Sequence, residues 1–418
     1  MNMMNSYFGT HPNYPFGIPT SKLGECVKYL KNLLGNEWVL NEIRSYQEWC
    51  NKNSIQLFRN VRPPCTNMLI PMFTVFDNWW SQTKKPKPPP LVIDLVTIAA
   101  IISYFEPYWS SLKADEGKNH IISNMKNPET CRGMIYELTT AFHYVRAGAI
   151  PVTPLFMKPE HEADILITWQ DIEIEIHCKS KIPGAGQKIH ADLFDYLAGC
   201  TLAYFSNLTS KSLHVKLICN NKLESEDVDN ILERIRTLIN IGLVGDYPIC
   251  ENRYTLKIRE IRIPPNGIPV SEVEKLHKPM YRAILADNAL QMLPGYGYYR
   301  LSVFDAISRK RPRVASSLKD GIKQAIKQAT GKRPSIIAIH FYDPMDWEVA
   351  NKLRGFTLFL EKILQQGRGK NVGVLILSGE PLSSERWTGQ VYERSLQKRQ
   401  YINPYANPSV RVPANFKV

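Results

Sequence analysis

One segment of the sequence, residues 172–179, carries several side chains that could take part in catalysis. It reads IEIEIHCK, so apolar and polar residues alternate without interruption. Successive side chains of a β-strand point to opposite faces, so the polar residues of this segment would share one face. These residues are Glu173, Glu175, His177 and Lys179. Apolar strands are expected on either side in the sequence, which predicts a central strand whose polar face lines a cleft.

Asp164 is expected to join this polar face from the preceding strand, predicted over residues 163–169. Gln170 and Asp171 separate the two strands and predict a tight hairpin. The hairpin would place Asp164 near His177 and Lys179. Such a set suits phosphodiester hydrolysis: carboxylates hold Mg²⁺, the metal polarises the phosphate and acidifies the attacking water, and lysine neutralises developing charge.

The elements that must position these side chains are predicted in the order helix, three strands, helix, strand. Asn127-Pro128-Glu129 predicts the start of the first helix and Gly148 its end. A glycine-rich loop at 183–186 precedes the second helix. The three strands are expected at 149–156, 163–169 and 172–179, the second helix at 188–206 and the last strand at 213–219.

This order, with its acid and lysine positions, resembles the PD-(D/E)XK, or restriction-endonuclease-like, nuclease superfamily over about residues 128–220. The matching text begins at MIYELTTAFHYV and continues through EADILITWQDIEIEIHCKSK. The resemblance implies an αβββαβ core within a mixed α/β sheet. It also implies that Asp164 is the aspartate of the second strand, that Lys179 is the motif lysine, and that Glu137 on the first helix supports a metal site.

The sequence departs from the family two residues before Lys179, where His177 replaces the expected Asp or Glu. Glu175 could substitute, because it lies on the same face about 6 to 7 Å further along the strand. Alternatively, His177 could bind a divalent ion directly, which would shift the preference from Mg²⁺ towards Mn²⁺. The expected metal ligands are thus Asp164, Glu175 and Glu137, with Lys179 and His177 completing the catalytic set.

The function implied by the resemblance is a metal-dependent nuclease, in the first instance an endonuclease, that hydrolyses phosphodiester bonds of DNA. The alternative is a catalytically degenerate core that binds nucleic acid or partner proteins without cleaving, with His177 marking the lost acid. The resemblance leaves open a homodimer and partner proteins of a defence or DNA-processing system.

Positive charge is concentrated near the end of the chain. The formal net charge is +13, and residues 300–418 contain 21 Lys and Arg against 9 Asp and Glu, a surplus of twelve. Such a basic region favours a polyanionic partner, although a solvated basic surface without a partner is the alternative. The predicted nucleic-acid contacts are Arg309, Lys310, Arg311 and Arg313, followed by Lys319, Lys323 and Lys327 at helical i, i+4, i+8 spacing.

The expected location is the cytoplasm. The eight cysteines are widely spaced, which favours reduced thiols over disulfides or a zinc finger. The first residues lack the pattern of a secretory signal. The longest apolar run, 91–105, contains Asp94 and suits a buried helix better than a membrane span.

Three regions are predicted along the chain. Residues 1–115 read as a mainly helical accessory domain that contains an extended Pro/Lys connector at 84–90. Residues 116–263 would form the nuclease-like core. Residues 264–418 would form a basic α/β extension that could complete the core sheet. Beyond residue 220 we expect helices at 226–240, 316–330 and 347–366, and strands at 254–263, 298–304, 335–342 and 372–378.

Overall fold

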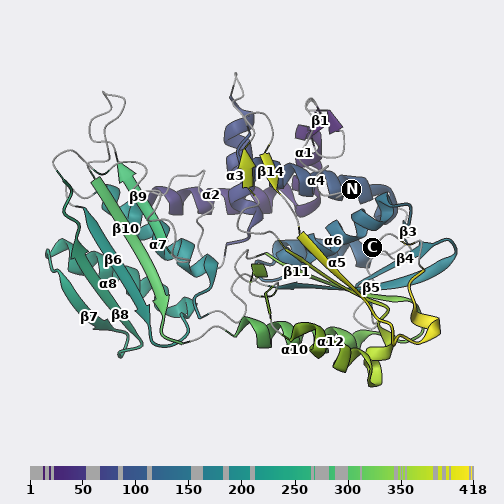
Figure 1. Ribbon diagram of the computed structural model, residues 1–418. Coiled ribbons are helices and arrows are strands. Elements are labelled where there is room, and N and C mark those ends of the chain that lie inside the picture. Colours follow the sequence, from purple (N-terminus) through teal and green to yellow (C-terminus); the bar gives the residue numbers. More distant parts are fainter. Residues whose placement is uncertain are drawn as a thin grey trace. The chain divides into compact units, whose positions relative to one another are not determined.

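The described part of the chain folds into two compact units, which are considered separately (Figure 1). Unit 1 comprises Met1–Ile43, Asn67–Ala185 and Val314–Val418, and unit 2 comprises Arg44–Thr66 and Gly186–Arg313. The computed structural model describes residues 13–14, 18–19, 23–52, 66–82, 88–110, 115–151, 163–181, 188–207, 212–264, 268, 282–287, 300–310, 313–342, 347–348, 350, 352–353, 355–379, 385–387, 392–394, 397–413 and 416.

The predicted helical character of the N-terminal region is confirmed for its described residues. The apolar run after residue 90 lies in α4, whose described side chains are largely buried, and Pro90 occupies the first helical position, where its missing N–H is not needed. None of the described helices is long and apolar enough to cross a membrane. The helices are α1 (Leu23–Leu34), α2 (Asn36–Lys52), α3 (Leu69–Trp80), α4 (Pro90–Ser110) and α5 (Asp115–Lys126).

A six-stranded mixed sheet forms the centre of unit 1, with strand order β15-β12-β11-β5-β4-β3. β5, β11 and β12 run parallel to one another, whereas β15, β4 and β3 each pair antiparallel with their neighbours. The chain is therefore of the α/β class. The strands are β3 (Ile150–Pro151), β4 (Ile165–Trp169), β5 (Ile172–Lys181), β11 (Ser335–Phe341), β12 (Val374–Gly379) and β15 (Gln397–Ile402).

The β4–β5 hairpin forms where the sequence predicts it. Gln170 and Asp171 have φ angles of 48° and 63°, the left-handed values that a two-residue type I′ turn requires at both central positions. This turn sets a register in which Ile165 lies opposite Ile176. The strand alternation predicted for residues 172–179 is thereby confirmed.

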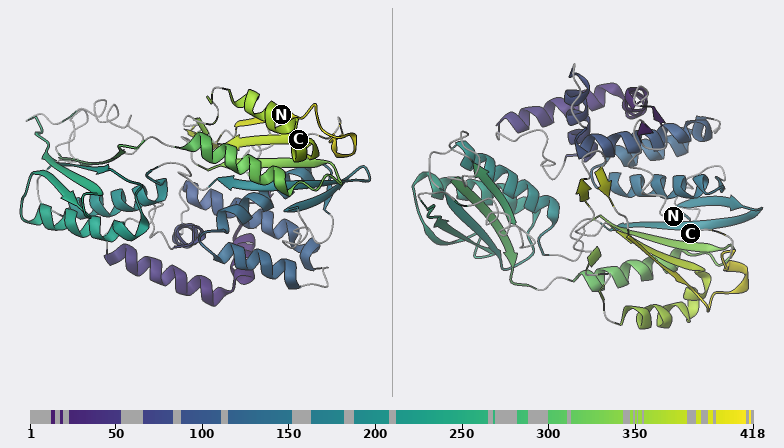
Figure 2. Two further views of the ribbon diagram at one scale, coloured as in Figure 1. Left: turned by 90° about the horizontal axis from the view of Figure 1, so that it is seen from below. Right: turned by 45° about the horizontal axis from the view of Figure 1, so that its top comes forward.

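Helices cover both faces of the six-stranded sheet, α6 (Cys131–Arg146) on one side and α10 (Val314–Gln328) with α12 (Phe356–Leu364) on the other (Figures 1 and 2). Gly148 ends α6 with a φ of 103°, as predicted. On the α10 side, the helices pack against alternate residues of β11 and β12, among them Ile337, Ile339 and Leu375. The intervening residues, such as His340, face α6.

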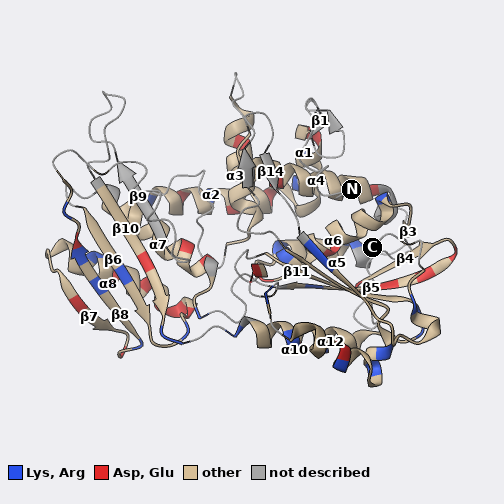
Figure 3. Cartoon of the chain, in the orientation of Figure 1, with Lys and Arg blue, Asp and Glu red and all other residues tan. Residues whose placement is uncertain are grey.

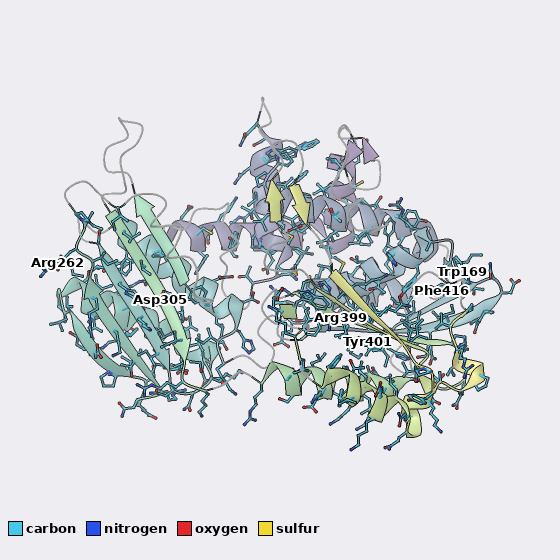
Figure 4. All side chains as sticks on the ribbon, in the orientation of Figure 1. Trp169, Arg262, Asp305, Arg399, Tyr401 and Phe416 are labelled. Atoms are coloured by element: carbon cyan, nitrogen blue, oxygen red, sulfur yellow. The ribbon has the colours of Figure 1, made fainter. Side chains whose placement is uncertain are left out.

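The last described residue, Phe416, packs beside β4 of this sheet. Phe416 lies edge-on to Trp169, with ring centroids 5.1 Å apart, and stacks on Tyr144 of α6 at 5.3 Å (Figure 4). Large aromatic side chains contribute much of the buried apolar area of a core. Smaller elements complete unit 1, namely β1 (Asn13–Tyr14), β2 (Ile18–Pro19), β13 (Glu385–Trp387), β14 (Tyr392–Arg394), η4 (Gly367–Asn371) and η5 (Pro408–Val410).

Unit 2 contains a five-stranded mixed sheet of order β7-β8-β6-β10-β9. Two helices pack on one face, where Phe194 contacts Phe304 with ring centroids 5.8 Å apart. Its elements are α7 (Ala191–Asn207), β6 (Leu213–Cys219), η3 (Ser225–Asp227), α8 (Val228–Asn240), β7 (Gly245–Ile249), β8 (Tyr254–Glu260), β9 (Arg282–Asp287) and β10 (Arg300–Ser308).

The predicted grouping of these elements is wrong. The helix and strand expected to complete the sheet after 172–179 are α7 and β6, which lie in unit 2 and in a different sheet. β5 instead pairs with β11, so the region 116–263 is not one compact unit. Periodicity identifies a strand but not its partner, which depends on packing between segments distant in the sequence. The predicted strand at 149–156 and loop at 183–186 extend outside the described residues, as does most of the connector at 84–90.

Candidate functional site

Asp164 and Lys179 meet at the carboxyl end of β5. The Lys179 Nζ lies 3.6 Å from the Asp164 Oδ2, and the same oxygen accepts a hydrogen bond of 2.7 Å from the Cys178 backbone N–H. Their side chains are 29% and 26% exposed. Both charged groups are therefore accessible to a ligand, and the backbone bond holds the carboxylate in place.

Glu137 belongs to the same electrostatic group. It lies on α6, and burial raises the pKa of its carboxyl to about 8, with the nearby Asp164 charge raising it further and Lys179 opposing this. The Glu137 carboxyl is therefore mostly protonated at neutral pH. We call Glu137, Asp164 and Lys179 the sheet-end group.

Glu175 and His177 form a second group with Thr330, which follows α10. Glu175 is fully buried, and its two carboxylate oxygens accept hydrogen bonds from the Thr330 backbone N–H at 3.0 Å and hydroxyl at 2.9 Å. His177 is also fully buried, its Nε2 lies 3.6 Å from the Glu175 Oε1, and neither ring nitrogen has a hydrogen-bond partner. We call Glu175, His177 and Thr330 the buried group.

The structure thus brings together three of the five predicted catalytic residues. Glu137, Asp164 and Lys179 lie together, whereas both oxygens of Glu175 are occupied by Thr330. The prediction that the polar face of residues 172–179 lines an open cleft is wrong for the middle of the strand, because Glu175 and His177 are buried. Among the described residues, no cluster of three or more His, Cys, Asp or Glu side chains is arranged to hold a metal ion.

A polar network beside the sheet-end group was not predicted from the sequence. His340 Nδ1 lies 3.0 Å from the Ser378 Oγ, and the imidazole stacks on Tyr136 of α6 at 5.1 Å. Tyr136 also hydrogen bonds Ser378 and Thr140 through its side chain. Burial lowers the pKa of His340 to about 4, so this ring is neutral at physiological pH. Its residues are separated in sequence by some 240 positions, and no local pattern links them.

The predicted nucleic-acid contacts divide between the two units. Lys319, Lys323 and Lys327 lie on α10 in unit 1, opposite a face formed by Leu318, Ile322 and Ile326, which confirms the predicted amphipathic helix. Lys319 lies over the Phe359 ring at 5.0 Å, and Lys323 lies 3.7 Å from Asp320.

Arg309 and Lys310 directly follow β10 in unit 2, and Arg313 ends that unit. The Lys310 Nζ donates a 2.7 Å hydrogen bond to the Asn221 Oδ1. Arg311 lies outside the described residues.

No protein-family model matches the chain, and comparison with curated proteins and with solved structures likewise gives no match.

Proposed function

We propose that the chain is a metal-dependent nuclease acting on DNA, with the sheet-end group as its catalytic centre. The single observation that carries the proposal is the convergence of Glu137, Asp164 and Lys179 from three different elements at one end of the sheet. Ligands of open α/β sheets bind outside the carboxyl ends of the strands, and β5, β11 and β12 all end at this side.

The order of elements in unit 1 supports the proposed relationship to PD-(D/E)XK nucleases. α6, β3, β4, β5, α10 and β11 follow one another in the αβββαβ order, and the larger segment of unit 2, Gly186–Arg313, is inserted between β5 and α10. This differs from the arrangement expected from the sequence, in which α7 and β6 completed the core. The proposed core keeps the predicted order but takes its second half from residues after 313.

The donor set suits a hard divalent cation such as Mg²⁺ or Mn²⁺. A cation bound beside Asp164 would favour the ionised form of the buried Glu137, and Mg²⁺ commonly uses one or two protein carboxylates together with water and phosphate. When bound, the cation would polarise the phosphate and acidify the attacking water. Lys179 would neutralise charge that develops on the phosphate, while the Cys178 N–H keeps the Asp164 carboxylate oriented.

A catalytically degenerate protein that binds nucleic acid is the competing proposal, and the buried group favours it. His177 stands where the family expects an acid, and Glu175, the nearest substitute, already accepts two hydrogen bonds from Thr330. In this account the sheet-end group is a remnant, and binding would be salt-sensitive but independent of metal.

Cleavage of supercoiled plasmid and of linear and single-stranded DNA in Mg²⁺, Mn²⁺ or EDTA separates the two proposals. A nuclease should cut only with metal, and Asp164→Ala and Lys179→Ala should each lose cutting while retaining DNA binding. Binding without cutting in any metal, or equal cutting by wild type and Asp164→Ala, would reject the nuclease.

A further inference from the structure

The sheet of unit 2 has a second face, opposite the one that packs on α7; its β10 side is covered, whereas its β6 and β8 side chains are partly exposed. Val215, Leu217 and Leu256 point towards the buried side, so the intervening residues of β6 and β8 form the other face. This face carries charged side chains in every one of its central strands. Figure 3 shows Lys and Arg on β6 and β8, with Asp and Glu on the flanking strands β7 and β10.

Basic residues lie directly opposite each other at two successive positions on this face. Lys216 of β6 is opposite Lys257 of β8, and His214 is opposite Arg259. Like charges placed directly across neighbouring strands destabilise a sheet. We call these four residues the basic block, and the alignment of Lys216 with Lys257 needs a compensating negative charge.

Two aspartates supply part of that charge. Asp246 on β7 pairs with Lys257 at 2.5 Å and with Arg259, and Asp305 on β10 pairs with His214 at 2.8 Å (Figure 4 labels Asp305). Lys216 lies opposite Asp305 in the β6–β10 register and forms no ion pair within 4.0 Å with another described residue. The block therefore holds a surplus of positive charge, and its side chains are accessible: His214, Lys257 and Arg259 are 31%, 37% and 50% exposed.

We propose that the basic block of unit 2 binds the phosphate backbone of double-stranded DNA, the substrate class of the proposed nuclease. This inference rests on the proposed nuclease function. Phosphate contacts require charge and hydrogen-bond donors rather than apolar anchors, and the four positions of the block offer only such groups. Protein partners are usually anchored by buried aromatic or aliphatic side chains, and single strands by stacking on aromatic rings; the block supplies neither.

Arg309 and Lys310 extend the positive charge beyond the block. They follow β10, which lies beside β6 in this sheet, and Cys219 accepts the Arg309 backbone hydrogen bond at 3.0 Å. These two residues were already predicted as nucleic-acid contacts. Arg309 and Lys310 thus lie at one end of the sheet that carries the basic block.

The test uses the full-length chain and fluorescence anisotropy of a labelled DNA duplex across a range of salt concentrations, in EDTA to prevent cutting. The variant Lys216→Gln/Arg259→Gln keeps long polar side chains but removes two charges. It should bind about tenfold more weakly, and the slope of log affinity against log salt should fall by about two. Lys352→Gln/Lys362→Gln, which removes two exposed charges from unit 1, is the matched control and should bind like wild type.

Unchanged affinity and salt slope in Lys216→Gln/Arg259→Gln would overturn the proposal, as would an equal loss in the control. If Lys216→Gln/Arg259→Gln binds poly-glutamate more weakly than wild type but binds duplex equally well, the face would suit an acidic protein, and the proposal would likewise be overturned. Unfolding curves confirm that both variants fold. If the wild-type protein binds duplex through the basic block but never cuts it with metal, the proposed nuclease function fails and the inference about the basic block stands. If the protein cuts DNA with metal but binds it independently of the basic block, the nuclease function stands and the inference fails.

Discussion

Strand β5 contributes to two acid-containing groups whose charges are compensated in opposite ways. In the buried group, Glu175 receives two hydrogen bonds from Thr330 and is closed off from solvent. In the sheet-end group, burial and then the Asp164 charge raise the pKa of Glu137 to about 8, while Lys179 opposes this, and Asp164 and Lys179 remain partly exposed. The hydrogen bonds of Glu175 hold the fold together, whereas the partly exposed sheet-end group can still bind a cation, which would favour ionisation of Glu137. The difference points to the sheet-end group as the functional one.

We expect the sheet-end group and the buried group to differ most in their effect on metal affinity. Asp164→Asn keeps an oxygen for the Cys178 N–H but removes the charge, so Mn²⁺ affinity measured by calorimetry should fall about 10- to 100-fold or more. Asp171→Asn, at the exposed hairpin turn, is the matched control and should leave the affinity unchanged. Equal Mn²⁺ affinities in the two variants would remove Asp164 from the metal site.

Replacement of Glu175 should act on stability rather than on metal binding. Glu175→Leu leaves the Thr330 N–H and hydroxyl without an acceptor, which should lower the free energy of unfolding in urea by about 1–3 kcal/mol. Mn²⁺ affinity of the folded variant should stay within a few-fold of wild type. A stable Glu175→Leu protein that has lost metal binding would instead support the role predicted for Glu175 from the sequence, as a metal ligand.

The pH dependence of stability should separate Glu137 from the buried group. Its pKa rises from 4.5 to about 8 on folding, so the folded protein holds a proton that the unfolded chain releases. The resulting stabilisation is fully present below pH 4.5 and is lost as the pH rises from 4.5 through about 8, by up to roughly 5 kcal/mol. Urea unfolding without metal should therefore show stability falling from pH 5 to pH 9 in wild type, relative to Glu137→Gln. Parallel pH profiles in the two proteins would refute the coupling.

The smallest effect is expected at His177. Both ring nitrogens are buried without hydrogen-bond partners, so an apolar residue of similar size should be tolerated. His177→Leu should change the free energy of unfolding by less than about 1 kcal/mol and leave metal affinity unchanged. Loss of metal affinity in a folded His177→Leu variant would make the histidine a ligand, as the sequence left open.

Local elements could be predicted from the sequence, and their assembly only in part: strands from the expected C-terminal extension do lie in the sheet of β5, but the partner of β5 was assigned wrongly. The alternation of 172–179, the Gln170-Asp171 turn and the strands at 213–219 and 335–342 all depend on nearest neighbours, and each lies where it was expected. The assignment of β6 to the core failed because β5 pairs with β11, about 160 residues further along the chain. Such pairing is decided by packing against α10 and α12, which local periodicity does not encode.

The candidate site was predictable to a similar extent. Asp164 and Lys179 were expected to meet from the hairpin register alone, and their 3.6 Å separation confirms this. The burial of Glu175 was not foreseen, because its partner Thr330 is 155 residues away. The polar face of the strand does not line one open cleft; its middle is covered, and only its end lies at the sheet-end group.

Anomalous diffraction at the manganese absorption edge, from a crystal of the full chain soaked in Mn²⁺, shows directly whether the sheet-end group binds a metal ion. We expect an anomalous peak coordinated by the carboxylates of Asp164 and Glu137. A peak at Glu175 and His177, or no ordered manganese within reach of Asp164, would contradict it.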